Sequence, residues 1–387
     1  MNILVVASYH YQGNLYPTAM FMHDQMRAFV RAGHRVRAVV RIPWGKAAEN
    51  GRRFGPPVWH EEVDGIDHVF VRQLSFSNYG IRHLNTWCAH AAVKRHIREL
   101  LDGFSPDVIH AHAIGPNTSA AALLRDRVGC PLVFTAHGET RCEEPWISEP
   151  ERIAQEANKA DLVACVSSLL ERQMQSVGVT VPTRTILNGF HVTTGGNTGT
   201  RPPVSLNYTG WLQKLKKVDI TLQAFSELKK QFPDATCTIT GSGVEEQALK
   251  ALVKRLGVED SVSFLGYLDN ETAIREMGKC RFFVMPSHPE GFGVVYLEAM
   301  ASGCVTIGTE GQGIADLIIS GVNGFLVPPD DPSAIVDVIT WCVRHPEEAE
   351  QIAERGRQSA MTQTWEKNAA EYTELFQFLL KGNDREI

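Results

Sequence analysis

The feature that most constrains the fold of this chain is an alternation, from end to end, of short β-branched runs and longer amphipathic segments. Apolar strands without polar alternation, separated by helices, are what a parallel sheet covered on both faces requires. Helical periodicity lies, for example, at residues 20–32 and 87–101. The strands expected in the first half lie at residues 3–7, 35–40, 68–72, 107–111, 132–136 and 162–166. This half therefore predicts a doubly wound α/β domain.

The alternation pauses after Asn188, where the sequence becomes rich in Gly, Pro and Thr and loses its periodicity, as is typical of a linker. Six further strands are then expected, at residues 205–209, 236–240, 261–265, 281–285, 305–308 and 324–327. The predicted organisation is an N-terminal domain (1–187), a linker (188–204), a second doubly wound domain (205–364) and a C-terminal helical segment (365–387) that packs back on the first domain. Ligands of such open sheets bind at the carboxyl ends of the strands.

The charge balance limits the class of partner. The 387 residues carry a formal net charge of −6, so nucleic acid is not attracted overall and an anionic partner needs a local patch. Residues 1–100 differ, because they contain 13 Lys and Arg against seven acidic residues. This basic segment is either a surface for an anionic membrane or ordinary solvated helix charge, and the sequence leaves both interpretations open.

The cysteines and the N-terminus bear on location. The eight Cys are scattered without a C-x-x-C pair, which argues against a zinc site or a disulfide framework and favours free thiols in a reducing cytoplasm. The apolar start Ile3–Ala7 is short and lacks a basic leader, so it is expected to be a strand and not a signal peptide. No run of about 18 apolar residues predicts a membrane span.

The segment with the most chemistry follows the strand expected at residues 281–285. Its loop contains Glu290, Gly291 and Gly293 and leads into a helix that carries Glu298. Glycines at a helix start let the backbone approach a ligand, and the free amides there suit an anion such as a diphosphate. The two carboxylates can face one ligand and accept hydrogen bonds from sugar hydroxyls. A pair of unrelated surface acids is the alternative.

The pattern Glu290-Gly-Phe-Gly-x-x-x-x-Glu298 resembles the E-x7-E signature of glycosyltransferase family 4, retaining enzymes of the GT-B fold. Weaker resemblances occur in the same order along nearly the whole chain, among them Asp107-Val-Ile-His110-Ala-His112, Thr135-Ala-His137-Gly138, Ile186-Leu-Asn188-Gly189, Thr240-Gly-Ser-Gly243 and Asn323-Gly-Phe-Leu-Val327. The resemblance implies two Rossmann-like domains facing a central cleft. It also implies transfer of a sugar, most consistently from a UDP-sugar, to an acceptor hydroxyl with retention at the anomeric carbon.

The resemblance also implies a role for individual residues. Glu290 would contact the donor sugar, Glu298 the ribose, and His137 the sugar from the opposite domain. Lys216 would stabilise the leaving diphosphate. The remaining expected donor-site residues are Gly210, Lys214, Tyr267, Phe292, Gly293, Val294 and Val295, with Gly13, Thr18 and Ala19 in a loop of the first domain. Tyr267 is either a nucleobase contact or an ordinary edge aromatic.

Some residues depart from the family pattern. Related sequences usually have Gly-Arg-Leu after the linker, whereas this chain has Gly210-Trp211-Leu212, so Lys214 or Lys217 would have to supply the missing charge unless the site is weaker. Ala19 stands where relatives tend to have Gly. His110 and His112 lie on one face of their strand, but no third metal ligand is evident and the family generally needs neither metal nor another cofactor.

The overall likeness is strongest to bacterial enzymes of cell-envelope and exopolysaccharide synthesis, which implies a carbohydrate or lipid-linked acceptor. The basic first hundred residues would fit a cytoplasmic protein in peripheral contact with the inner face of the membrane. Two other functions stay open at this point. One is a GT-B nucleotide-sugar epimerase, although such enzymes lack the E-x7-E signature. The other is a non-catalytic or weakly active sugar-nucleotide-binding protein, which Trp211 at the usual Arg position would fit.

Overall fold

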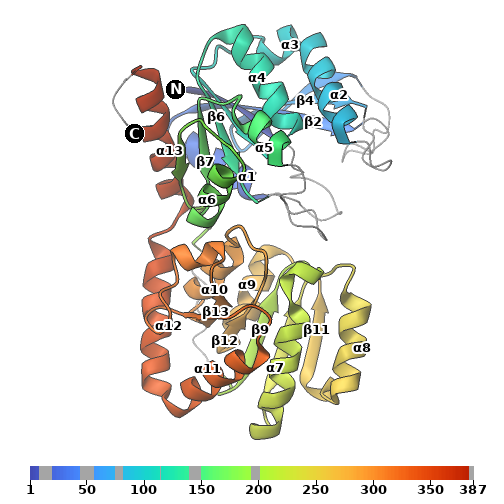
Figure 1. Ribbon diagram of the computed structural model, residues 1–387, viewed down its shortest axis with the longest axis vertical. Coiled ribbons are helices and arrows are strands. Elements are labelled where there is room, and N and C mark those ends of the chain that lie inside the picture. Colours follow the sequence, from blue (N-terminus) through green and yellow to red (C-terminus); the bar gives the residue numbers. More distant parts are fainter. Residues whose placement is uncertain are drawn as a thin grey trace. The chain divides into compact units, whose positions relative to one another are not determined.

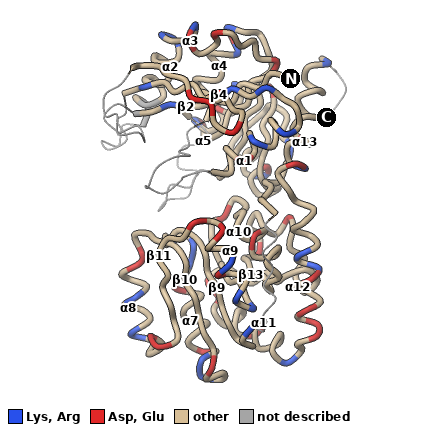
Figure 2. The backbone as a smooth tube through the Cα atoms, turned by 180° about the vertical axis from the view of Figure 1, so that it is seen from behind, with Lys and Arg blue, Asp and Glu red and all other residues tan. Residues whose placement is uncertain are grey.

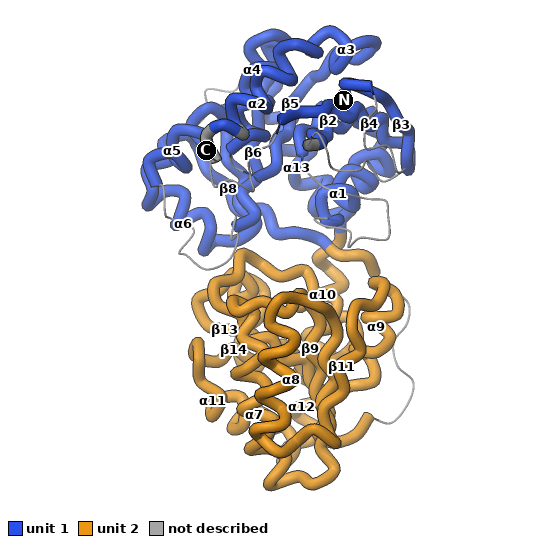
Figure 3. Tube along the Cα trace, turned by 90° about the vertical axis from the view of Figure 1, so that its right-hand side faces the viewer, with its two compact units in different colours: residues 1–139, 146–189, 365–387 blue, residues 140–145, 190–364 orange. Residues whose placement is uncertain are grey.

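The computed structural model describes residues 1–7, 20–43, 56–74, 82–113, 115–138, 150–192 and 201–382. The chain forms two compact units (Figure 3). Unit 1 comprises residues 1–139, 146–189 and 365–387, and unit 2 comprises residues 140–145 and 190–364. Each unit is a mainly parallel sheet flanked by helices (Figure 1), which confirms the predicted fold class.

Unit 1 is built on an eight-stranded sheet with the order β3-β4-β2-β1-β5-β6-β7-β8. Every neighbouring pair is parallel except β3 and β4. The strands are β1 (Asn2–Ala7), β2 (Arg35–Pro43), β3 (Val58–Val63), β4 (Ile66–Gln73), β5 (Val108–His112), β6 (Leu132–Ala136), β7 (Leu162–Cys165) and β8 (Thr183–Thr185). The helices are α1 (Met20–Arg31), α2 (Arg82–Arg95), α3 (Ile97–Leu101), α4 (Pro116–Val128), α5 (Pro150–Ala157), α6 (Ser168–Ser176) and α13 (Trp365–Leu380).

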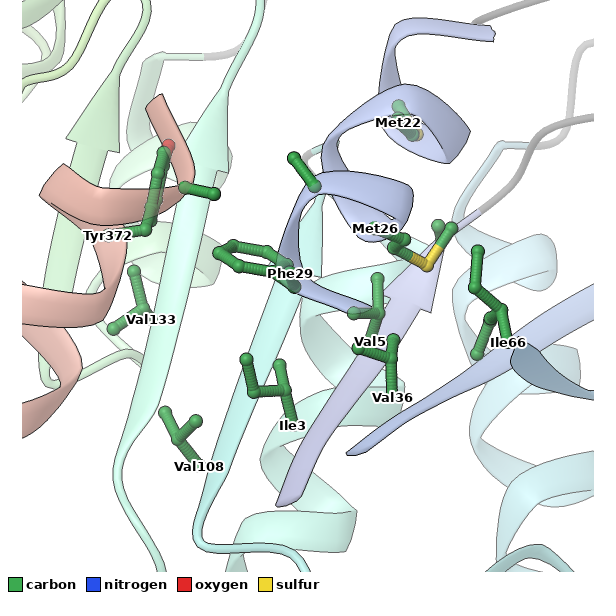
Figure 4. Packing of buried hydrophobic residues seen from close by; sticks show 14 of the residues in the cluster. Ile3, Val5, Met22, Met26, Phe29, Val36, Ile66, Val108, Val133 and Tyr372 are labelled. Carbon is green, nitrogen blue, oxygen red and sulfur yellow. The ribbon is translucent and has the colours of Figure 1, made fainter. Parts of the chain in front are cut away.

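One hydrophobic core of unit 1 lies where α1 and α13 cover one face of this sheet. Figure 4 shows Val5 and Val133 of the strands near Phe29 of α1 and Tyr372 of α13, and all four side chains are almost completely buried. Alternate residues of a strand point to opposite faces, so each central strand contributes to this core and to the one beneath α4. Burying an apolar side chain of this size contributes about 1.5–3 kcal/mol, which explains why the central strands read as unbroken apolar runs.

Polar contacts also attach helix α13 to unit 1. The Tyr372 hydroxyl lies 2.8 Å from the Thr135 Oγ1 atom, and the Asn368 amide donates to the Leu187 carbonyl at 2.7 Å. Gln25 of α1 donates to the side chain of Asn368, also at 2.7 Å. The last helix of the chain is therefore part of the core of unit 1.

Unit 2 contains a six-stranded, fully parallel sheet with the order β11-β10-β9-β12-β13-β14. Its strands are β9 (Ser205–Thr209), β10 (Thr236–Thr240), β11 (Val262–Gly266), β12 (Phe282–Val284), β13 (Val305–Thr309) and β14 (Phe325–Val327). Its helices are α7 (Val218–Gln231), α8 (Glu246–Leu256), α9 (Asn270–Gly278), α10 (Val294–Ala301), α11 (Pro332–Arg344) and α12 (Pro346–Met361). Because all strands are parallel, the loops after their carboxyl ends share one edge of the sheet.

The differences from the predicted elements lie at the edge of the first sheet and in its helices. Two edge strands, β3 and β8, were not predicted, because β3 is a half-exposed alternating strand and β8 has only three residues, Thr183–Thr185. The pair Asp64-Gly65, with φ of 55° and 74°, forms the turn between antiparallel β3 and β4. The helix expected at residues 87–101 is interrupted at His96 and becomes α2 and α3.

None of the helices in the described ranges is long and apolar enough to cross a membrane.

Candidate active site

The carboxyl edge of the unit 2 sheet brings most of the predicted donor-site residues onto a few neighbouring loops. Strands β9 and β12 are adjacent, so the loop after β9, with Gly210, Lys214 and Lys216, lies beside the loop after β12, with Glu290. A backbone hydrogen bond of 2.8 Å from His288 to the Leu215 carbonyl joins the two loops directly. This arrangement follows from the strand order and could not be read from sequence distance.

At the centre of this edge Lys216 forms an ion pair with Glu290. The Lys216 Nζ atom lies 2.5 Å from the Glu290 Oε2 atom, and the side chains are only 20% and 11% exposed. The Ser287 hydroxyl donates to the same oxygen at 2.7 Å. Within the part of the chain that the structure describes, Oε1 of Glu290 has no partner. That oxygen is therefore available to accept a hydrogen bond from a ligand hydroxyl.

The charge of Glu290 affects the pKa of two neighbouring phenols, Tyr208 and Tyr296. Burial, and after it the charge of Glu290, raises the pKa of Tyr208 and of Tyr296 well above the ordinary value. Both phenols are thus neutral hydrogen-bond donors: Tyr208 donates to the Trp211 carbonyl at 2.8 Å and Tyr296 to the Met285 carbonyl at 2.6 Å. They fix the loop after β9 and the start of α10 relative to the sheet.

The start of helix α10 has the geometry of an anion site. Gly293 caps the helix with φ of 82°, and a Cβ atom there would lie 2.7 Å from the ring of Tyr296, so a larger residue does not fit. The first amides of a helix have no acceptor within it, which leaves those of Val294 and Val295 for a ligand. The Phe292 side chain is buried, with 2% exposed, so this residue can offer a ligand only its main chain.

Glu298 lies in the second turn of α10, as the spacing predicted. Its Oε1 atom accepts a hydrogen bond of 2.8 Å from the Asn270 amide, at the start of α9.

Two other predicted donor-site side chains, those of Tyr267 and Lys214, are exposed. Tyr267 follows β11 and is 48% exposed. Lys214 is exposed after β9, whereas the neighbouring Lys217 pairs with Asp330 at 2.7 Å.

In unit 1 the predicted His137 belongs to a group of three histidines at the ends of β5 and β6. The His137 Nε2 atom lies 2.8 Å from the His112 Nδ1 atom, and the His110 Nε2 atom lies 2.7 Å from the Thr135 hydroxyl. Burial lowers the pKa of His137 to about 3 and that of His110 to about 3, the latter also through the charge of His137. Burial likewise lowers the pKa of His112, so all three rings are neutral near pH 7. The Nδ1 atom of His137 is buried and has no partner in the described chain.

The predicted Gly13, Thr18 and Ala19 lie outside the described residues. Among the residues that are described, no group of three or more His, Cys, Asp and Glu could hold a metal ion.

Sequence reasoning missed three residues that contact Glu290 or Glu298. Ser287 contacts the Glu290 carboxylate, Gln312 contacts the Glu290 main chain, and Asn270 contacts the Glu298 carboxylate. Neither Asn270 nor Gln312 belongs to a motif that the sequence analysis recognised.

Comparison with protein families now identifies both units. Residues 18–193 match the model described as Glycosyltransferase Family 4, and residues 201–359 match the model described as Glycosyl transferases group 1. The chain is a family 4 glycosyltransferase. It is therefore a transferase that moves sugar groups, as the E-x7-E pattern implied.

Individual relatives of this glycosyltransferase are distant. It is 25% identical over 364 residues to a glycogen synthase of Mycobacterium tuberculosis, covering 87% of this chain and 84% of the relative. It is 27% identical to an N-acetyl-alpha-D-glucosaminyl L-malate synthase of Bacillus anthracis, covering 82% and 86%. A D-inositol 3-phosphate glycosyltransferase of Corynebacterium urealyticum is 28% identical, covering 72% of each chain.

Solved structures confirm the GT-B fold of this glycosyltransferase. Sucrose-phosphate synthase from Thermosynechococcus elongatus superposes with a TM-score of 0.80 at 20% identity and covers 99% of this chain and 100% of the other. The Anabaena protein HepE, in complex with UDP and glucose, gives a TM-score of 0.71 at 21% identity, with 97% and 99% covered.

Proposed function

We propose that this enzyme transfers a sugar from a UDP-sugar to a hydroxyl group of a carbohydrate or lipid-linked acceptor, with retention at the anomeric carbon, in polysaccharide or glycolipid synthesis. The observation that carries the proposal is the contact between Lys216 and Glu290, which leaves Oε1 of Glu290 available in the loop that leads into α10. A cation, a carboxylate acceptor and a helix start are what a diphosphate attached to a polyhydroxylated ring requires.

In this proposal each residue acts at a defined stage. Cleavage of the bond between the anomeric carbon and the diphosphate oxygen leaves negative charge on the diphosphate, which Lys216 and the amides of Val294 and Val295 stabilise. Glu290 holds a sugar hydroxyl and Glu298 holds the ribose. The leaving phosphate takes the proton of the acceptor hydroxyl as that oxygen attacks the same face, so no protein nucleophile is required. For unit 1 we assign the contact with the donor sugar to His137, whose neutral ring can donate or accept one hydrogen bond.

The choice of a UDP-sugar is supported by similarity of fold. HepE has been solved with UDP-glucose, and a pneumococcal O-GlcNAc transferase, which superposes with a TM-score of 0.71, has been solved with UDP and GlcNAc. The names of the sequence relatives indicate several different products. They therefore support sugar transfer but do not select an acceptor.

A shift in melting temperature tests the nucleotide. UDP should raise the midpoint of unfolding more than GDP or ADP at equal concentration, because a ligand that binds only the folded state stabilises it by mass action. A larger shift with GDP or ADP would replace UDP in the proposal.

The role of Glu290 is tested by Glu290→Ala, assayed by release of UDP from a UDP-sugar. We expect transfer to fall below detection while the Kd for UDP changes by less than about threefold, since Glu290 is assigned to the sugar and not to the nucleotide. Glu227→Ala is a matched control, because Glu227 pairs with Lys230 on the surface of the same unit. Transfer at the wild-type rate by Glu290→Ala would contradict the assignment.

We further propose that the basic part of unit 1 contacts an anionic membrane. Figure 2 shows both basic and acidic positions around α2 and α3. Lys94 and Arg95 are exposed on the last turn of α2, and Trp87 of the same helix is 66% exposed. Basic side chains near an anionic surface contribute about 1 kcal/mol each. Replacing Lys94 and Arg95 with Glu should weaken co-sedimentation with anionic vesicles, whereas the same change at Lys254 and Arg255 of α8 should not. Equal binding by all variants would contradict a surface at α2.

A further inference from the structure

Gln312 lies in the loop after β13, on the same sheet edge as Glu290, and its side chain is largely buried, with 8% of the residue exposed. The Gln312 Oε1 atom accepts a hydrogen bond of 2.8 Å from the backbone N–H of Glu290. A backbone N–H can only donate, so this contact fixes which end of the Gln312 amide faces Glu290. The sequence did not indicate this residue as part of the site.

The next residue binds the other main-chain group of Glu290. The Gly313 N–H donates to the Glu290 carbonyl at 3.1 Å. A Cβ atom at Gly313 would lie 1.8 Å from the Gly291 carbonyl oxygen, so the two loops are in backbone contact at this point and only glycine fits. The loop after β13 therefore binds both the N–H and the carbonyl of Glu290.

The carboxylate of Glu290 depends on this support. Its two side-chain partners within the described ranges, Lys216 and Ser287, both contact Oε2, and Ser287 is on the same loop as Glu290. These side-chain contacts do not determine how far the loop lies from the sheet, so main-chain contacts must do so. A catalytic carboxylate displaced by about 1 Å loses much of its effect, because the geometry of a reacting ligand is set to within a fraction of an ångström.

We propose that Gln312 is a positioning residue for Glu290, holding its backbone N–H so that Oε1 faces the donor sugar. The inference rests on the proposed role of Glu290. It assigns Gln312 no contact with the nucleotide, since the residues expected to bind that part, Glu298 and Tyr267, lie on other elements.

The perturbation that tests this is Gln312→Met, which keeps the approximate volume and removes the acceptor. The Glu290 N–H then loses its partner, and the loop shifts to regain one in solvent. We expect kcat for UDP release from the donor, measured without acceptor, to fall about 10- to 100-fold, with the Kd for UDP within about threefold of wild type. Gln358→Met, at an exposed position of α12, is the matched control.

A double-mutant cycle separates positioning from general damage. In a Glu290→Gln background the carboxylate is already gone, so adding Gln312→Met should change the residual rate less than about threefold. The same fold-loss in both backgrounds would overturn the proposal, because Gln312 would then act independently of Glu290. If Gln312→Met does not fold, Gln312→Asn, which keeps the amide and shortens its reach, is carried through the same cycle with the same criterion.

Failure of the proposed function has a different signature. If wild type releases no nucleotide from any UDP-sugar, the proposed donor is wrong. If wild type is active and Glu290→Gln retains the wild-type rate, the role of Glu290 is wrong. If Glu290→Gln is impaired and Gln312→Met has the wild-type rate, the role of Glu290 stands and only the inference about Gln312 is wrong.

Discussion

Replacing Lys216 with Met tests the central contact of the site through stability and catalysis together. Among the described residues, the substitution leaves the Glu290 carboxylate, 11% exposed, with only the neutral Ser287 hydroxyl as a side-chain partner. Exposed ion pairs contribute about 0–1 kcal/mol, and breaking a fully buried pair costs about 3–5 kcal/mol. Because Lys216 is 20% exposed, breaking its pair with Glu290 should have an intermediate cost of about 2 kcal/mol. For a domain of this size that loss lowers Tm by about 4–8 °C.

Catalysis should fall by a larger factor than stability alone explains. Lys216 is the cation assigned to the leaving diphosphate, and removing one group that stabilises developing charge costs about 10²–10³ in kcat. The assay is steady-state UDP release at saturating donor, at a temperature where Lys216→Met is folded. Lys230→Met, which breaks a surface pair with Glu227, is the control for both measurements and should change neither by much.

The double variant Lys216→Met/Glu290→Met separates the two roles. If the stability loss arises from a stranded carboxylate, removing that carboxylate as well should restore most of the Tm. Activity should stay lost, because both assigned groups are absent. A Lys216→Met enzyme with unchanged kcat and a lowered Tm would refute the catalytic role and leave Lys216 as a purely structural partner.

Three further predictions concern the donor site and pH. Glu298→Ala should weaken UDP binding about 10-fold, measured by calorimetry, and unchanged affinity would contradict its ribose contact. Lys214→Met should raise KM for the donor about 5- to 10-fold, and Trp211→Arg in that variant should recover part of the loss; an unchanged KM would exclude Lys214 from the site. Because burial lowers the pKa of His110 and His137 to about 3, unfolded chains bind protons below pH about 6.5 that folded ones do not, so stability falls as pH falls. Between pH 6.5 and 5.5 each ring should cost about 1 kcal/mol, measured by urea unfolding, and His110→Asn should reduce that dependence.

The sequence predicted the central strands well and the edges poorly, for a physical reason. Strands buried on both faces must be apolar throughout, so β9 and β10 were located to the residue. An edge strand has a solvated face and fewer apolar positions, as in β3, where half-exposed and exposed residues alternate. The break at His96 between α2 and α3 had no glycine or proline to mark it.

The candidate site was predictable only as far as local pattern extends. The spacing of Glu290 and Glu298 placed one in a loop and the other in the second turn of a helix, which is where the structure has them. Their partners come from loops up to 74 positions away, as Lys216 does, or from a loop with no recognised motif, as Gln312 does. Contacts of this kind depend on strand order, which one sequence does not specify.

The distribution of cations around the site indicates which side chain could take the place of the usual Arg. Lys216 is held by Glu290, and Lys217 by Asp330, so neither has its full charge free for a ligand. Lys214 is exposed after the same strand and has no ion pair within the described residues. Trp211 contributes its carbonyl to the Tyr208 hydroxyl, a contact of the backbone that an Arg would make equally well. Trp211 therefore removes a charge through its side chain while its carbonyl still holds the loop. The exposed Lys214 side chain is the group through which that charge can be replaced. Ordering this side chain has an entropic cost that a preorganised guanidinium would not incur.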